Sequence, residues 1–206
     1  MFDAAMSAHE IPTDDRWFVY LLSATDCSAF KVGFSCNPLQ RIYSFSHRYF
    51  EHFDLAASRL LSVGTCDTAR EIEAFIKHIF REFRGACPLW VLPQAGGETE
   101  WFSAVYFEDA TAQLASKTNP GEPLLEVEEL IRQQLVTVRS FFEHWAVAQA
   151  SSILQARSSL QRKLAAVERR TLRDWIDAYR HFGIPIFADD DEARRLMSSI
   201  AARAYA

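Results

Sequence analysis

Residues 17–35 read WFVYLLSATDCSAFKVGFS, and their pattern indicates how the fold begins. Two runs rich in aromatic and β-branched residues, 17–22 and 29–34, are separated by a short polar connection. Strands favour these residue types, and a short polar link between two such runs is typical of a β-hairpin. We therefore expect the fold to begin with two antiparallel strands.

The segments after the hairpin predict alternating helices and strands. Asn37 and Pro38 supply an N-cap and a first-turn proline for a helix. Residues 55–63 form an apolar stretch that we interpret as a third strand. Thr68 and Glu71 have the S/T-x-x-E form of a capping box and predict the start of a second helix. The apolar residues that follow at helical spacing are Ile72, Phe75, Ile76, Ile79 and Phe83.

A turn-rich stretch separates two halves of different composition. Residues 100–106 are strand-like, a short helix is expected from about Glu108, and residues 116–123 read SKTNPGEP, which breaks regular structure. We therefore predict an α+β domain over residues 1–118, with a hairpin-based three-stranded sheet flanked by helices. Residues 119–206 are predicted to form an all-helical domain.

The helical prediction rests on the spacing of apolar residues. Residues 124–182 contain neither Gly nor Pro, and their apolar positions recur at intervals of three and four. A helix of almost 60 residues is unusual in a globular domain, so we expect a break near residues 150–152. The acidic cluster at residues 189–192 favours the N-terminus of a last short helix.

Composition and charge limit the classes of protein. The 206 residues are 49% hydrophobic and 24% charged, which is too apolar for a disordered chain. No apolar run near the start approaches the roughly 20 residues of a membrane helix, no signal-peptide pattern is present, and we expect a cytoplasmic protein. No C-x-x-C pair is present, so a zinc ribbon does not fit.

The net charge of −5 means that binding to phosphates would need a local basic patch. Residues 1–118 hold 10 basic and 15 acidic side chains, which accounts for the whole net charge. Residues 157–181 are locally basic, with seven Arg or Lys against three acids.

Five residues have the order and local setting of a nuclease site: Tyr20, Lys31, Gly33, Arg41 and Glu73. The first three lie on the predicted hairpin, where facing strands bring a phenol and an ammonium onto one small surface. Arg41 falls in the helix that follows. Glu73 borders the buried face of the second helix when residues advance by about 100° each.

These residues resemble the motifs of the GIY-YIG nuclease superfamily. Val19-Tyr20 stands where its first motif ends, and Lys31-Val32-Gly33 stands where its second lies. Residues 31–41 are similar to the stretch that joins the second motif to the catalytic arginine. The match is closest to a phage-associated branch with K-I-G in the second motif and a terminal G-E-W-F signature, to which residues 97–102, GETEWF, are similar with an inserted Glu-Thr. The resemblance covers about residues 16–110.

The sequence also departs from the superfamily pattern. Phe18-Val19 replaces the small residue and isoleucine before the first tyrosine, and Lys31 replaces the tyrosine of the second motif. Glu100 and the Trp101-Phe102 pair are expected to close the domain by packing, with Glu100 accepting hydrogen bonds from nearby backbone.

The resemblance implies a metal-dependent endonuclease that hydrolyses DNA. Tyr20, with Lys31, would activate water once its pKa is lowered from about 10. Arg41 would clamp the phosphate, and Glu73 would hold Mg²⁺ or Mn²⁺. Structural roles are the alternatives: a core aromatic for Tyr20, a surface charge for Arg41, and an i,i+4 pair with Lys77 for Glu73.

The C-terminal half carries a predicted basic stripe. Four arginines lie within about 20° of a common direction on one helix: Arg162, Arg169, Arg173 and Arg180. With Arg48 they are the predicted DNA contacts, and a solvated helix face is the alternative. The opposite side carries an apolar seam for packing on the preceding helix or for a homodimer: Leu160, Leu164, Val167, Trp175 and Tyr179.

The sequence therefore predicts a GIY-YIG-like endonuclease domain followed by a helical domain that binds DNA, oligomerises, or both. The rival interpretation is a non-catalytic module that keeps the fold and binds nucleic acid or a protein. The acidic N-terminal half favours this rival, and the retained Tyr20, Arg41 and Glu73 oppose it.

Overall fold

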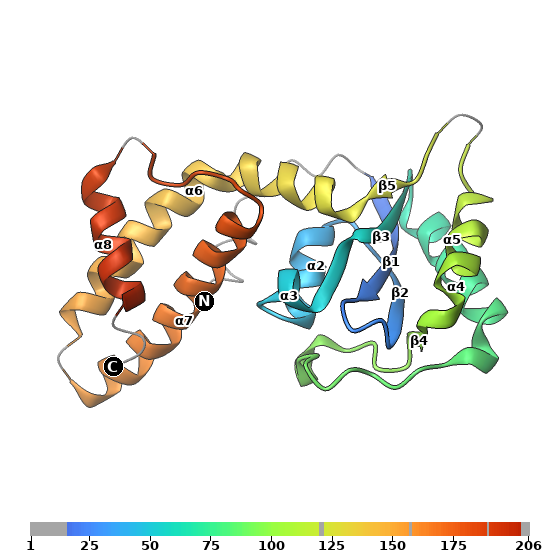
Figure 1. The fold of residues 1–206 in the computed structure, drawn as a ribbon, viewed down its shortest axis with the longest axis horizontal. Helices are drawn as coiled ribbons and strands as arrows, with labels where there is room; N and C mark the ends of the chain where they lie inside the picture. Colours follow the sequence, from blue (N-terminus) through green and yellow to red (C-terminus); the bar gives the residue numbers. More distant parts are fainter. Residues whose placement is uncertain (1–15, 120–121, 157, 189, 203–206) are drawn as a thin grey trace. The chain divides into compact units, whose positions relative to one another are not determined.

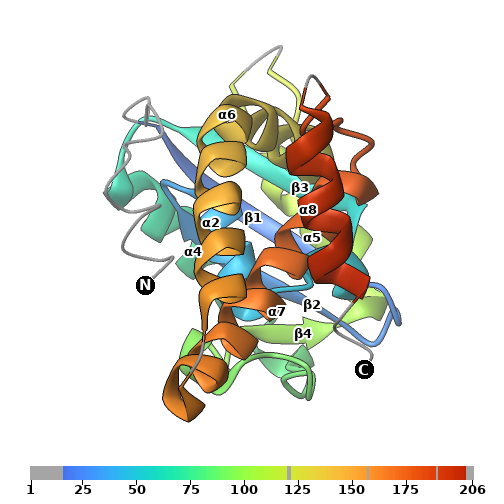
Figure 2. The ribbon, with the colours of Figure 1, turned by 90° about the vertical axis from the view of Figure 1, so that its left-hand side faces the viewer.

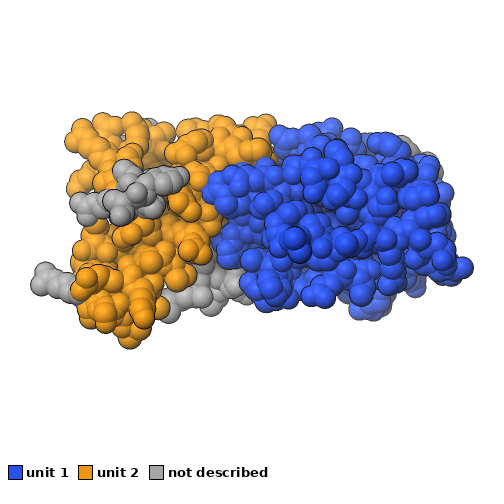
Figure 3. All heavy atoms as spheres, turned by 60° about the horizontal axis from the view of Figure 1, so that its bottom comes forward, with its two compact units in different colours: residues 1–131 blue, residues 132–206 orange. Residues whose placement is uncertain are grey.

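The computed structural model describes residues 16–119, 122–156, 158–188 and 190–202. The chain forms two compact units, residues 1–131 and 132–206, which Figure 3 distinguishes by colour. The division falls inside helix α6 (Val127–Gln155), after the turn-rich stretch. Its first turn belongs to unit 1, where Val127 and Ile131 are fully buried.

Unit 1 is built on a five-stranded antiparallel sheet with the strand order β4-β2-β1-β3-β5 (Figure 1). Its strands are β1 (Trp17–Ala24), β2 (Ala29–Ser35), β3 (Phe53–Val63), β4 (Trp101–Ser103) and β5 (Leu125–Glu126). The predicted hairpin is confirmed, with Tyr20 opposite Gly33. The predicted α+β class is also confirmed, although the sheet is larger than three strands because β4 and β5 add short pairings to its two edges.

Helices cover both faces of this sheet. Figure 1 shows α2 (Pro38–Phe45) and α3 (Tyr49–His52) on one side, and α4 (Cys66–Ile79) and α5 (Phe107–Ala115) on the other. Short 3-10 helices lie at Arg81–Phe83 (η1), Pro93–Ala95 (η2) and Ala104–Tyr106 (η3). The Asn37 cap is confirmed, since its side chain accepts a hydrogen bond from Gln40 N at 3.1 Å.

Helix α4 starts earlier than the sequence predicts. Thr65 is its N-cap, and the Thr65 side chain accepts a hydrogen bond from Thr68 N at 3.1 Å. The capping box predicted at Thr68 and Glu71 is therefore wrong, because Thr65 caps the helix one turn upstream and Glu71 remains exposed. Aromatic and aliphatic side chains from β1, β2, α4 and α5 form the main core of this unit.

Unit 2 contains the remainder of α6, α7 (Ser159–His181) and α8 (Asp191–Ala202), which face the viewer in Figure 2. The break predicted near residues 150–152 lies slightly later, because α6 continues to Gln155. Ser158 and Gln161 then form a capping box for α7. The predicted last helix is confirmed as α8. Among the helices of the described ranges, none combines the length and the apolar character that crossing a membrane requires.

Candidate active site

Tyr20 is positioned by the hairpin register. It lies opposite Gly33, and its ring covers that glycine. A Cβ atom added at Gly33 would lie 2.2 Å from the Tyr20 oxygen and 2.4 Å from its ring carbon Cζ. Only glycine therefore allows the Tyr20 ring to lie across β2, which explains why glycine stands at position 33.

Arg41 is held beside the phenol. Its Nε donates to the Tyr20 oxygen at 3.4 Å, and its Nη1 donates to the Ala95 carbonyl at 2.8 Å. The guanidinium carbon lies 4.4 Å from the centroid of the Phe45 ring, so a cation–π contact adds to these bonds. Three contacts therefore fix the direction of a side chain that leaves α2 near its middle.

The environment of Tyr20 keeps its hydroxyl protonated. The side chain is 1% exposed, and burial raises its pKa to about 12, although the nearby Arg41 charge opposes this shift. Without a metal, this shift is opposite to the lowering that the sequence-based interpretation of Tyr20 requires, since desolvation of the phenolate outweighs the single guanidinium. At neutral pH the group is a neutral phenol whose oxygen accepts from Arg41.

Lys31 is fully buried on β2. Its Nζ donates to the Gly97 carbonyl at 2.7 Å and to Glu100 Oε2 at 3.0 Å, and it lies 5.0 Å from the Phe45 ring centroid. Burial lowers the pKa of Lys31, whereas the Glu100 carboxylate raises it. Gly97 has φ of 72°, and a Cβ there would lie 2.6 Å from Lys31 Nζ, so a glycine is required for this contact.

Glu73 is buried, with 6% exposure, and joins Lys31 through two intermediate side chains. Lys77 Nζ donates to Glu73 Oε2 at 3.1 Å and to Glu100 Oε1 at 3.0 Å. A continuous ionic chain therefore runs Lys31–Glu100–Lys77–Glu73. The Glu73–Lys77 pair is the i,i+4 pair that the sequence offers as the structural alternative to a metal role.

Glu100 differs from its predicted role. Its carboxylate binds two lysines, whereas the sequence predicted bonds from nearby backbone. Burial raises the pKa of its carboxyl, but Lys31 and Lys77 together lower it below the ordinary value. No local pattern indicated this arrangement, because Lys31 and Glu100 are 69 residues apart in the chain.

Glu73 is the candidate ligand for a divalent metal ion. No group of three or more His, Cys, Asp or Glu side chains in the described ranges converges on one point. Glu73 Oε1 makes no hydrogen bond to a described residue, and Mg²⁺ accepts one or two carboxylates with water as its other ligands. Glu73 thus fits a water-rich divalent ion, with the Lys77 ammonium as a competing cation. Burial raises the pKa of the Glu73 carboxyl, and the Lys77 ammonium opposes this shift.

The structure brings together all four predicted catalytic residues. Electrostatic interactions link Tyr20 to Arg41 and Glu73, and Lys31 to Arg41 and Glu73. Arg48 is not part of the cluster. Its guanidinium forms a two-bond ion pair with Glu51, at 2.7 and 2.5 Å.

The predicted basic stripe does not form one continuous exposed row. Arg180 pairs with Asp177 at 2.8 Å, whereas Arg162 and Arg169 line a cavity within unit 2. Arg173 is half-buried, and its Nε makes no hydrogen bond. The apolar seam is also divided: Trp175 and Tyr179 belong to the core, and the other three members are exposed, namely Leu160, Leu164 and Val167.

Comparisons with protein-family models, with curated proteins and with solved structures give no match for this chain.

Proposed function

We propose that this chain is a GIY-YIG-type endonuclease that hydrolyses phosphodiester bonds of DNA. The observation that supports this best is the clustering of Tyr20, Lys31, Arg41 and Glu73, which come from two strands and two helices. The motif order in the sequence predicts the same four residues. A phenol, two cations and a metal-binding carboxylate can supply the activated nucleophile, the charge stabilisation and the help for the leaving oxygen that phosphodiester hydrolysis needs.

Arg41 binds the phosphate in this proposal. Its Nη2 makes no hydrogen bond to a described residue, so a donor remains for a phosphate oxygen. Its Nε and Nη1 are already bound, which fixes the direction of the free donor. A pre-oriented guanidinium stabilises negative charge that develops on the phosphoryl oxygens.

Tyr20 and Lys31 act on the attacking water. Because the pKa of Tyr20 is about 12, the phenolate that accepts a proton is a minor species at neutral pH and becomes more abundant as the pH rises. Lys31 supplies positive charge near this centre, held in place by Glu100. A divalent ion bound at Glu73 would supply charge neutralisation at the leaving oxygen.

Substrate access requires movement of the segment before β4. Tyr20 and Lys31 are almost completely buried, and the carbonyls of Ala95 and Gly97 accept hydrogen bonds from Arg41 and Lys31. We therefore propose that residues 84–100 open when DNA binds, as a lid does in many enzymes.

The second candidate is a non-catalytic module with this fold. The burial of Tyr20 and Lys31, together with the ion pair on Glu73, favours it, because each group already serves a structural contact. Here the cluster stabilises unit 1, and DNA or a protein binds elsewhere.

The proposed partners are DNA and, for a homodimer through the C-terminal helices, a second copy of the chain. Exposed Leu160, Leu164 and Val167 support the homodimer proposal. The enzyme would act in the cytoplasm, where its DNA substrate lies.

A cleavage assay distinguishes the two candidates. Supercoiled, single-stranded and branched DNA are incubated with the chain in Mg²⁺, in Mn²⁺ and in a chelator, and binding is measured on the same DNA. The nuclease proposal requires metal-dependent cleavage that is lost on Glu73→Ala. DNA binding without cleavage in any metal would support the non-catalytic module.

A further inference from the structure

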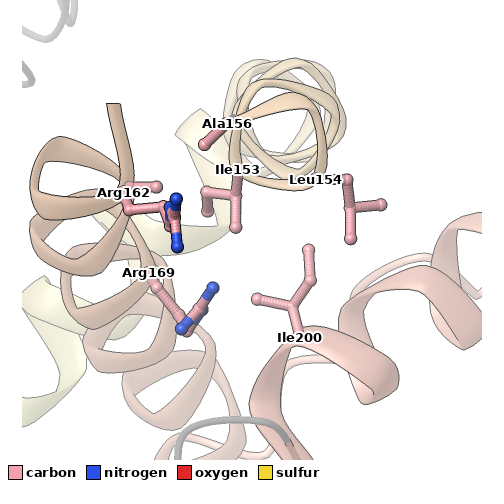
Figure 4. A pocket seen from close by; sticks show the side chains of 7 residues that line it. Ile153, Leu154, Ala156, Arg162, Arg169 and Ile200 are labelled. Carbon is pink, nitrogen blue, oxygen red and sulfur yellow. The ribbon is translucent and has the colours of Figure 1, made fainter. Parts of the chain in front are cut away.

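Unit 2 contains a cavity of about 330 Å³ that the proposed nuclease function does not use. Figure 4 shows its walls: Ile153 and Leu154 come from α6, Arg162 and Arg169 from α7, and Ile200 from α8. The volume lies within the range of small-molecule sites. A space of this size can therefore hold one small ligand.

The two arginines give the cavity its chemistry. In Figure 4 both guanidinium groups point from α7 into the space between the helices. Arg169 makes no hydrogen bond or ion pair with a described residue, and its Nε is buried without a partner. Burying such a donor unpaired is unfavourable. An anion in the cavity would compensate this cost.

The other lining residues favour an anion attached to an apolar body. None of the described residues that line this cavity is acidic. The aliphatic side chains of Ile153, Leu154 and Ile200 form the remaining walls. Apolar walls with a few convergent polar groups are typical of small-molecule sites.

The geometry does not suit a duplex lying along α7. Arg162 and Arg169 line one concave space, whereas Arg180 is paired with Asp177. Contacts along a duplex backbone would instead need an exposed row of cations. Two converging guanidinium groups match a single phosphate, because each presents a fork of donors to its oxygens.

We propose that unit 2 carries a binding site for a phosphate group borne on a small apolar body. Arg162 and Arg169 bind the phosphate oxygens, and Ile153, Leu154 and Ile200 contact the apolar part. The same chemistry occurs in a free phosphorylated small molecule and in the 5′-phosphorylated end of a DNA strand. The site does not depend on the proposed nuclease activity.

Calorimetry on the full chain tests the site with three probes. Phenyl phosphate carries both features, inorganic phosphate only the charge, and phenol only the ring. We expect phenyl phosphate to bind at least tenfold more tightly than either of the other two. The proposal is overturned if phenyl phosphate and inorganic phosphate bind with equal affinity, or if phenyl phosphate does not bind measurably. This test needs only the parent protein.

Substitutions then locate the binding. Arg169→Gln should weaken phenyl phosphate binding at least tenfold, and Leu154→Ala should weaken it while leaving inorganic phosphate unaffected. Arg180→Gln is the matched control on the same helix, with no expected change. Circular dichroism confirms that each variant is folded. Unchanged affinity in folded Arg169→Gln would overturn the assignment.

The natural source of the phosphate is distinguished with two oligonucleotides of one sequence. Tighter binding of the 5′-phosphorylated than of the 5′-hydroxyl strand, lost on Arg169→Gln, assigns the site to DNA ends. Equal binding of the two strands, together with tight binding of phenyl phosphate, assigns it to a free small molecule.

Discussion

Removing the Lys77 ammonium should tighten divalent-cation binding at Glu73. Lys77 Nζ lies 3.1 Å from Glu73 Oε2 and 3.0 Å from Glu100 Oε1. A divalent ion that shares Glu73 Oε2 with this ammonium, at a Mg²⁺–oxygen distance of about 2.1 Å, would therefore lie at most about 5 Å from the ammonium nitrogen. Like charges at so short a distance oppose each other even in water.

The magnitude follows from Coulomb's law. Charges of +1 and +2 at about 5 Å repel by about 1.7 kcal/mol at the dielectric constant of water. This repulsion corresponds to a roughly 15-fold change in Kd, and a lower local dielectric constant makes it larger. Lys77→Met, which keeps the length of the side chain and removes its charge, should lower the Kd for Mn²⁺ by at least tenfold.

The assay is a titration with Mn²⁺, in which electron paramagnetic resonance reports the free ion. Lys163→Met, an exposed lysine on α7, is the control and should leave the Kd unchanged. If folded Lys77→Met has an unchanged or higher Kd for Mn²⁺, the metal does not bind at the Glu73 carboxylate. The measurement is independent of cleavage, so it separates metal binding from nuclease activity.

Four further outcomes are expected. Glu73→Ala should lower metal-dependent cleavage at least 100-fold, and cleavage at the parent rate would remove Glu73 from the mechanism. Its melting temperature should change by no more than about 5 °C, because Lys77 keeps its pair with Glu100. Tyr20→Phe removes only the hydroxyl and should lower the cleavage rate nearly as much, and an equal rate would leave Tyr20 as a core aromatic. Because the Tyr20 pKa is about 12, the phenolate fraction and the parent rate should rise about tenfold per pH unit from pH 7 to 10, and a plateau near pH 8 would contradict a Tyr20 base. Gly33→Ala places a Cβ 2.2 Å from the Tyr20 oxygen and should lower the free energy of unfolding, measured with urea, by about 1–3 kcal/mol. Gly64→Ala is the control, because a Cβ there meets nothing within 4 Å, and it should lower this free energy by less. Equal decreases in the two variants would refute the ring contact.

Local signals in the sequence were sufficient for much of the fold. The hairpin, the Asn37 cap and the position of α8 depend on interactions within a few residues, and the structure confirms them. The candidate residues Tyr20, Lys31, Arg41 and Glu73 were also identified from motif order. Their interaction as one cluster was then a consequence of the hairpin register and of the helices that flank the sheet.

The ionic partners could not be read from the sequence. Glu100 meets Lys31 and Lys77 across 69 and 23 residues, and no short-range pattern encodes such contacts. The raised pKa of Tyr20 has the same origin, because it depends on how completely distant segments exclude water.

Helix α7 shows most clearly where the sequence alone was not sufficient. Its periodicity predicted an apolar seam and a basic stripe, and both sets of residues lie on this helix. Which side faces its neighbours depends on the helices available to cover it. The tertiary structure buries Trp175 and Tyr179, leaves Leu160 exposed and turns Arg169 toward a cavity, because only part of each face meets α6 or α8.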